Sequence, residues 1–90
     1  MKVRIRFAEV DEVVEAPDAA ALLARAKAEA ARRAPLLLRG VVRGMSDMQF
    51  AGEAVRRANA ATGENDPAPA SAQEFLDWAT QRGYLTVLEP

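Results

Sequence analysis

The first residues of the chain alternate regularly between basic and apolar side chains. Residues Lys2–Phe7 read KVRIRF, so the apolar side chains of an extended chain point to one side and the basic ones to the other. This pattern predicts a half-buried strand. We expect a turn at Glu9–Glu12 and a short second strand at Val13–Ala16, because that hairpin sets the basic face of the first strand beside acidic residues. One long bent strand is the alternative.

The segment Ala19–Ala34 has the composition of a helix. It consists of Ala, Leu, Arg, Lys and Glu, which are strong helix formers. Asp18 is placed to cap the free amide groups at its start, and Pro35 ends it. Few of its apolar side chains are large, so we expect a helix that packs closely but buries little area; its apolar stripe comprises Ala19, Leu22, Leu23, Ala26 and Ala30.

The short apolar run Leu36–Val42 fits two structures. Its length and composition favour a buried strand, in which Gly40 marks a bulge. A short buried helix that begins at Pro35 stays open, because periodicity does not separate a strand from a helix over so few residues. The strand is the structure that we carry into the predicted topology.

A second helix is marked by signals at both of its ends. Ser46 and Gln49 have the spacing of a capping box, in which each side chain accepts a hydrogen bond from the backbone of the other residue. Gly63 supplies the left-handed residue that closes a helix. The following residues, Glu64–Ala70, contain two prolines and an Asn-Asp pair, which predict a loop.

The third helix is the best-marked element of the chain. Ser71–Glu74 predicts a capping box at its start, and Gly83 with an apolar residue after it predicts a Schellman closure at its end. The chain then returns as a strand over Tyr84–Leu88. The buried side of the helix is expected to comprise Phe75, Leu76, Trp78 and Ala79.

Together these elements predict one α+β domain that spans residues 1–90. We expect a single-layer sheet of three to four strands with three helices mainly on one face, in the order β-(β)-α-β-α-α-β. Ninety residues leave no room for a second hydrophobic core.

Composition removes most catalytic chemistry. The chain has no Cys and no His, which excludes disulfides, thiolate nucleophiles, Cys/His zinc sites, Ser–His pairs and the usual ligands of haem and iron–sulfur clusters. The apolar stretch Pro35–Met45 is interrupted by arginines, whereas a membrane span needs roughly 20 apolar residues. Half of the residues are apolar and 28% are charged, which is typical of a soluble globular chain. We therefore expect a cytoplasmic protein without membrane association and without a cofactor.

Carboxylates remain as possible ligands or catalysts. The acidic stretch Glu9–Glu15 lacks the glycine and the spacing of a Ca²⁺ loop, so we interpret it as a solvated strand or turn. Trp78 and Tyr84 could stack on a base, but their apolar neighbours favour packing in the core or an interface. We accordingly predict no catalytic and no metal-binding residues, and an enzyme that uses carboxylates or arginine–anion contacts is the least favoured class.

The net charge of −1 conceals a segregation of charge along the chain. Residues 1–8 and 19–63 carry an excess of basic side chains, whereas residues 9–18 and 64–90 carry an excess of acidic ones. Arginines that cluster on one surface would bind an anion or a nucleic-acid backbone. The possible contacts of this kind are Arg39, Arg43, Arg56 and Arg57.

The sequence favours an interaction or structural module without catalytic activity. We expect a homodimer, because the terminal strand is apolar on both faces and such edges pair readily. Its possible interface residues are Tyr84, Leu85, Val87 and Leu88. A different protein partner would use the same kind of surface. The alternative is a nucleic-acid-binding accessory or regulatory domain that uses the arginines as a patch.

Overall fold

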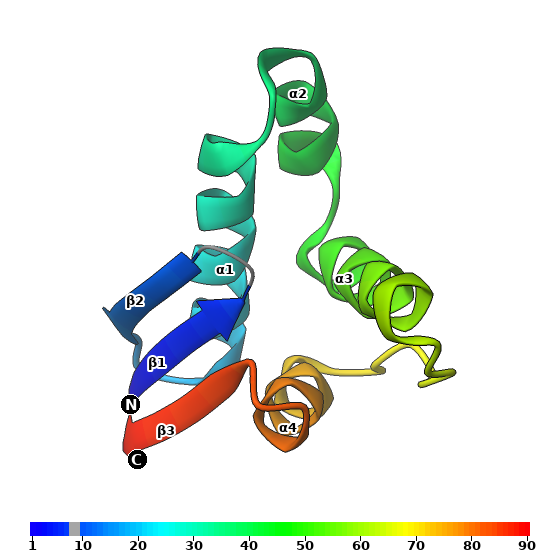
Figure 1. Cartoon of the computed structure of the whole chain (residues 1–90). Coiled ribbons are helices and arrows are strands. Elements are labelled where there is room, and N and C mark those ends of the chain that lie inside the picture. Colours follow the sequence, from blue (N-terminus) through cyan, green and yellow to red (C-terminus); the bar gives the residue numbers. More distant parts are fainter. Residues whose placement is uncertain (8–9) are drawn as a thin grey trace.

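The computed structural model describes residues 1–7 and 10–90 of the chain. Within these residues the elements follow one another as two strands, four helices and a final strand (Figure 1). Their bounds are β1 Lys2–Phe7, β2 Val10–Glu15, α1 Ala19–Arg33, α2 Leu36–Gly44, α3 Asp47–Thr62, α4 Ala72–Gln81 and β3 Leu85–Glu89. The α+β class is therefore confirmed, with one helix more and one strand fewer than the predicted order.

The sheet has the order β2-β1-β3, and both pairs of neighbours are antiparallel. The predicted hairpin is confirmed, and its basic strand does lie beside the acidic one: the guanidinium of Arg4 donates two hydrogen bonds of 2.8 Å to the carboxylate of Asp11. Val3 lies opposite Val14 on one side and Val87 on the other, and its side chain is fully buried. The alternation of Lys2–Phe7 thus fixes which face of the sheet is covered.

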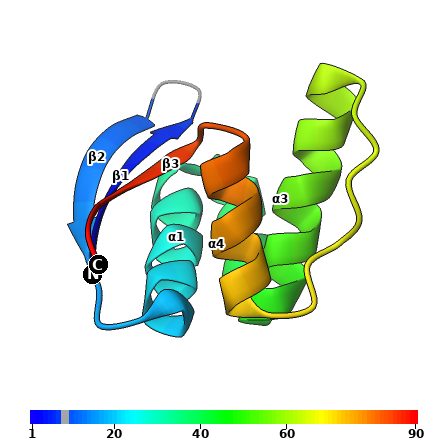
Figure 2. The same ribbon diagram turned by 90° about the horizontal axis from the view of Figure 1, so that it is seen from below.

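The helices lie on one side of the sheet in two further layers (Figure 2). α1 and α4 form the layer next to the sheet, and α3 lies beyond them. The core between the sheet and the first helix layer comprises Val3, Val14, Ala16, Leu22, Leu76, Ala79 and Leu85. α3 buries only Ala51, Val55 and Ala58. These are small side chains, which let α3 approach its neighbours closely.

Most predicted helix ends are confirmed. The carboxylate of Asp18 accepts a 2.8 Å hydrogen bond from the backbone of Ala21, and Ser46 and Gln49 form the predicted capping box. Ser71 Oγ accepts from the backbone of Glu74, but the Glu74 carboxylate accepts from the backbone of Ala70. In this second capping box the Glu74 side chain therefore accepts from the residue before the N-cap, whereas the motif predicts that it accepts from the backbone of Ser71.

The predicted strand at Leu36–Val42 is wrong, because these residues belong to the helix α2. The helix begins directly after Pro35, whose carbonyl accepts hydrogen bonds from Leu38 (2.8 Å) and Arg39 (3.1 Å). The open alternative of a helix after Pro35 is thus correct in type, but it is not a buried helix. A strand here would need a partner strand, whereas α2 lies away from the sheet (Figure 1).

The predicted turn at Glu9–Glu12 needs a second, smaller correction. Asp11 and Glu12 lie within β2, so the second strand begins earlier than expected, at Val10. Glu9 lies outside the described residues. The terminal strand is displaced from the prediction by one residue, to Leu85–Glu89.

The end of α4 depends on the backbone conformation of Gly83. Its φ is 80°, and the Schellman bonds run from Gly83 N to Thr80 O (3.1 Å) and from Tyr84 N to Ala79 O (2.9 Å). A Cβ at this position would meet nothing within 4 Å, so a side chain is opposed by the backbone conformation alone.

We expect Gly83→Val to lower the free energy of unfolding by more than about 1 kcal/mol, because a β-branched residue is strained at positive φ. The measurement is a urea titration followed by circular dichroism. Gly52→Ala is the control, since Gly52 is helical and a Cβ there makes an ordinary 3.9 Å contact with Ala68. A Gly83→Val variant as stable as the unmodified chain would contradict the proposed role of this residue.

Candidate interaction surfaces

Two of the candidate arginines are held by an acidic neighbour. On α3, Arg56 Nε lies 2.9 Å from Glu53 Oε2, and Arg57 Nε lies 3.1 Å from Glu53 Oε1. These hydrogen bonds, with Arg56 as the stronger partner, hold the pKa of Glu53 below its usual value. The carboxylate therefore stays ionised and offsets part of the positive charge that a nucleic acid would need.

The other two candidate arginines lie on α2, so the four are divided between two helices. Arg39 is half-buried and is turned toward the end of α1, where Nη2 lies 3.4 Å from the carbonyl of Ala34. Arg43 is exposed in the last turn of α2. Neither contacts a carboxylate among the residues that the structure describes.

The start of α3 has free backbone amides that could attract an anion, but it is occupied by side chains of the chain itself. Ser46 Oγ accepts from the amide of Gln49 at 3.1 Å, which uses one of the free amides. The carboxylate of Asp47 lies 3.1 Å from Lys27 Nζ, and the same ammonium donates to the carbonyl of Met45 at 2.8 Å. Lys27 thus fastens α1 to the start of α3, and the Asp47 carboxylate opposes an incoming anion.

Asp66 is a polar centre that the sequence did not predict. Its carboxylate accepts from Trp78 Nε1 (3.0 Å) and from Arg82 Nε (2.8 Å) and Nη2 (2.6 Å), while its backbone is held by the side-chain amide of Asn59. The loop between α3 and α4 is thereby fastened to both helices. The Arg82 guanidinium, with a further contribution from Trp78, lowers the pKa of Asp66. No local motif signals this arrangement, because its members are separated by 7 to 16 residues along the chain.

The aromatic side chains pack on one another. The ring of Tyr84 lies with its centroid 4.9 Å from that of Phe7 and 5.5 Å from that of Trp78, which in turn lies 5.7 Å from that of Phe75. These distances are typical of stabilising aromatic pairs. Trp78 and Tyr84 therefore join β1, α4 and the start of β3, as the packing interpretation expected.

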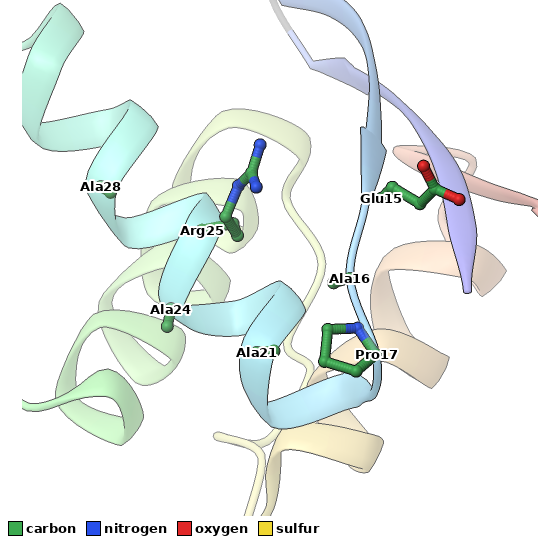
Figure 3. Close-up of a pocket in the computed structure, with 7 residues that line it drawn as sticks. All are labelled: Glu15, Ala16, Pro17, Ala21, Ala24, Arg25 and Ala28. Carbon is green, nitrogen blue, oxygen red and sulfur yellow. The ribbon is translucent and has the colours of Figure 1, made fainter.

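Two open hollows mark the surface of the described residues. One, of about 290 Å³, lies between the end of β2 and α1; Figure 3 shows that its lining is mostly small and that the carboxylate of Glu15 points away from Arg25. The other, of about 410 Å³, runs along α3 and includes Glu53, Arg56, Asn59 and Asp66. These polar side chains already pair within the chain. Neither hollow presents convergent free polar groups of the kind that catalysis requires.

Exposed apolar side chains are concentrated on α2. The described residues include eight large apolar side chains that are exposed, and half of them lie on α2: Leu36, Leu37, Leu38 and Val41. Val87 and Leu88 of β3 are exposed to 39% and 46%. The other residues of the predicted interface are turned inward, because Leu85 belongs to the core and Tyr84 packs against it. Sequence reasoning missed the α2 surface because it expected the leucines to be buried in a strand.

Comparison with known proteins does not assign a function to the chain, so the functional inference rests on the surfaces described above. Comparison of the chain with protein-family models, with curated proteins and with solved structures finds no match. Within residues 1–7 and 10–90, no cluster of three or more acidic side chains could hold a metal ion. In the same residues no helix has the length and apolar character that crossing a membrane requires.

Replacing the Asp66 carboxylate tests its role and its protonation together. We expect Asp66→Asn to lower the urea midpoint at pH 7, because the amide cannot accept both hydrogen bonds from Arg82 with the strength of a carboxylate. Since folding lowers the pKa of Asp66, its stabilising effect is present above the unfolded pKa of about 3.9 and is lost as the pH falls through the folded value. The difference between the two chains should therefore shrink in acid.

Asp77→Asn is the control, because Asp77 is an aspartate on the neighbouring helix α4 and accepts only from Gln73 (3.0 Å) in the described structure. Its midpoint should follow that of the unmodified chain at each pH. A difference for Asp66→Asn that stays constant from pH 7 to about pH 2 would show that the ionised carboxylate does not fasten the loop.

Proposed function

We propose that this chain is a small interaction module without catalytic activity, and that it self-associates as a homodimer. The observation that carries the proposal is that leucine and valine side chains are exposed on two separate elements, four of them on α2 and two on β3. Exposed apolar surface that is concentrated on one element of a small protein is typical of a site that binds another protein. In the hollow along α3 the polar side chains of Glu53, Arg56 and Asp66 already pair within the chain, so they are not free to act on a substrate.

The outer edge of β3 is one candidate contact for a second copy. Arg6 N donates to Tyr84 O at 2.8 Å, so in an antiparallel ladder the backbone groups of Leu85 and Val87 point away from β1. Such an edge is a template for another strand. The exposed surface of α2 is the second candidate, and it lies at the other end of the molecule (Figure 1).

Sedimentation velocity tests self-association directly. We expect a species of about twice the 9.7 kDa mass of one chain at micromolar concentration, because burial of the apolar surface favours two-fold association. A chain that stays monomeric at every concentration up to about 0.5 mM would rule the homodimer out.

Nucleic-acid binding is the competing function, and fluorescence anisotropy separates it from the proposal. We expect no specific binding of duplex DNA or of RNA near physiological salt, because Arg56 and Arg57 share Glu53 and the exposed side of α4 carries Glu74 and Asp77. Micromolar affinity that falls steeply with salt, and that is lost in the double variant Arg56→Ala/Arg57→Ala, would contradict the proposed function. The chain would then be a nucleic-acid-binding domain.

A further inference from the structure

We infer that the two copies of the proposed homodimer meet through α2, which packs antiparallel on the α2 of the second copy with Gly40 at the crossing point. This inference rests on the proposed self-association and names its surface. It assigns the contact to α2 rather than to the edge of β3.

The exposure of α2 sets it apart from the rest of the molecule. Leu37 is 92% exposed, Leu36 78% and Val41 55%, and none of the nine residues of α2, all of which the structure describes, is buried. β3 is less exposed, since Leu85 lies in the core and Val87 is exposed to 39%. The larger apolar surface is therefore the one whose burial favours association more.

Helical spacing arranges five of the exposed residues of α2 in two rows, and exposed Leu38 lies outside both of them. Residues four apart lie on the same side of a helix, so Leu37 and Val41 form one apolar ridge. Leu36, Gly40 and Gly44 form the neighbouring row, which is a knob followed by two positions without a side chain. The surface is thus a ridge beside a shallow groove.

The fold of a single copy does not explain the two glycines. A Cβ built on Gly40 or on Gly44 meets nothing within 4 Å, so one copy has room for a side chain at both positions. Glycine is also the least favourable ordinary residue inside a helix, which is where Gly40 lies. Both observations are explained if a second backbone approaches α2 closely at these positions, as glycine allows.

An antiparallel pair of α2 helices is complementary to itself. With the two-fold axis at Gly40, Leu36 of one copy lies opposite Gly44 of the other, and the knob of each helix fills the gap of its partner. The ridges formed by Leu37 and Val41 lie on the same side of the crossing and interdigitate. A parallel pair would set Leu36 against Leu36, which leaves the glycine positions empty.

The charges of α2 are compatible with this arrangement. Arg39 is turned toward the carbonyl of Ala34 and leaves the contact face. The exposed Arg43 side chains lie on opposite ends of the crossing, about 9 Å apart along the helix axes, which is about one Debye length in physiological salt. The opposed helix dipoles favour the antiparallel direction.

The size of the surface predicts the strength of the dimer. A nine-residue helix is about 13 Å long, so the contact is smaller than the roughly 800 Å² per partner of a standard stable interface. We therefore expect a dissociation constant in the micromolar range.

The first experiment fills the groove without harming the fold. We expect Gly40→Leu to keep or raise the urea midpoint, because leucine favours the helix and has room in one copy, and to weaken dimerisation by roughly tenfold or more in sedimentation velocity. Ala61→Leu is the matched control, since it places the same side chain at an exposed position of α3 and should leave dimerisation unchanged. Val87→Lys tests the β3 edge and should also leave it unchanged.

The second experiment uses the absence of cysteine from the chain. A disulfide requires Cα atoms less than about 7 Å apart, so Gly40→Cys should form a disulfide-linked dimer under mild oxidation, whereas Ala61→Cys should not. When the two variants are mixed, and one of them carries a tag so that a mixed dimer can be recognised, Leu36→Cys should link to Gly44→Cys. Leu36→Cys alone should stay unlinked. Linkage of Leu36→Cys to itself would overturn the antiparallel direction.

The outcomes separate this inference from the proposed function. A dimer that is weakened by Gly40→Leu and retained in Val87→Lys supports both. A dimer that is unaffected by Gly40→Leu but lost in Val87→Lys overturns the α2 contact and leaves the homodimer standing. An unmodified chain that is monomeric throughout overturns both.

Discussion

The packing of α1 and α4 on one face of β1 is the interaction on which the rest of the structure depends. Val3 is fully buried at the centre of the sheet, and Leu22 of α1 and Leu76 of α4 belong to the same cluster. A three-stranded sheet is narrow, so two helices suffice to cover its face (Figure 2). Any further helix must pack on other helices rather than on the sheet.

This limit explains why α2 is exposed. α3 finds a place beyond the first helix layer because its small residues Ala51, Val55 and Ala58 allow a close approach. α2 lies between the end of α1 and the start of α3, where Pro35 ends one helix and begins the next. It contacts α1 at the end of the molecule, and its leucines find no second surface to cover them (Figure 1). The exposure thus follows from the position of α2 in the chain.

The elements that the sequence predicted well are those that depend on neighbouring residues. Asp18, Ser46 and Gly83 act on backbone groups within a few positions, so their roles are visible in local spacing. The alternation of Lys2–Phe7 likewise fixed a strand and its buried face. Leu36–Val42 could not be assigned in this way, because the choice between strand and helix depended on where the fold places these residues relative to the sheet. For the same reason the sequence located apolar residues at the surface of β3 but not those of α2.

The charged residues show the same division between what is local and what is not. The sequence identified arginines and acidic segments, and it indicated the hairpin that pairs Arg4 with Asp11. It did not indicate the pairs that join distant segments, which are Arg33 with Glu12 and Arg82 with Asp66. The segregated charges of the sequence therefore cancel one another in part within the fold, whereas Arg39 and Arg43 contact no carboxylate among the described residues. A partner gains little by competing for charges that are already paired, since exposed ion pairs contribute modestly and are screened by salt. Apolar contact is the stronger source of affinity that the described surface offers, and it is concentrated where the helix layers leave α2 uncovered.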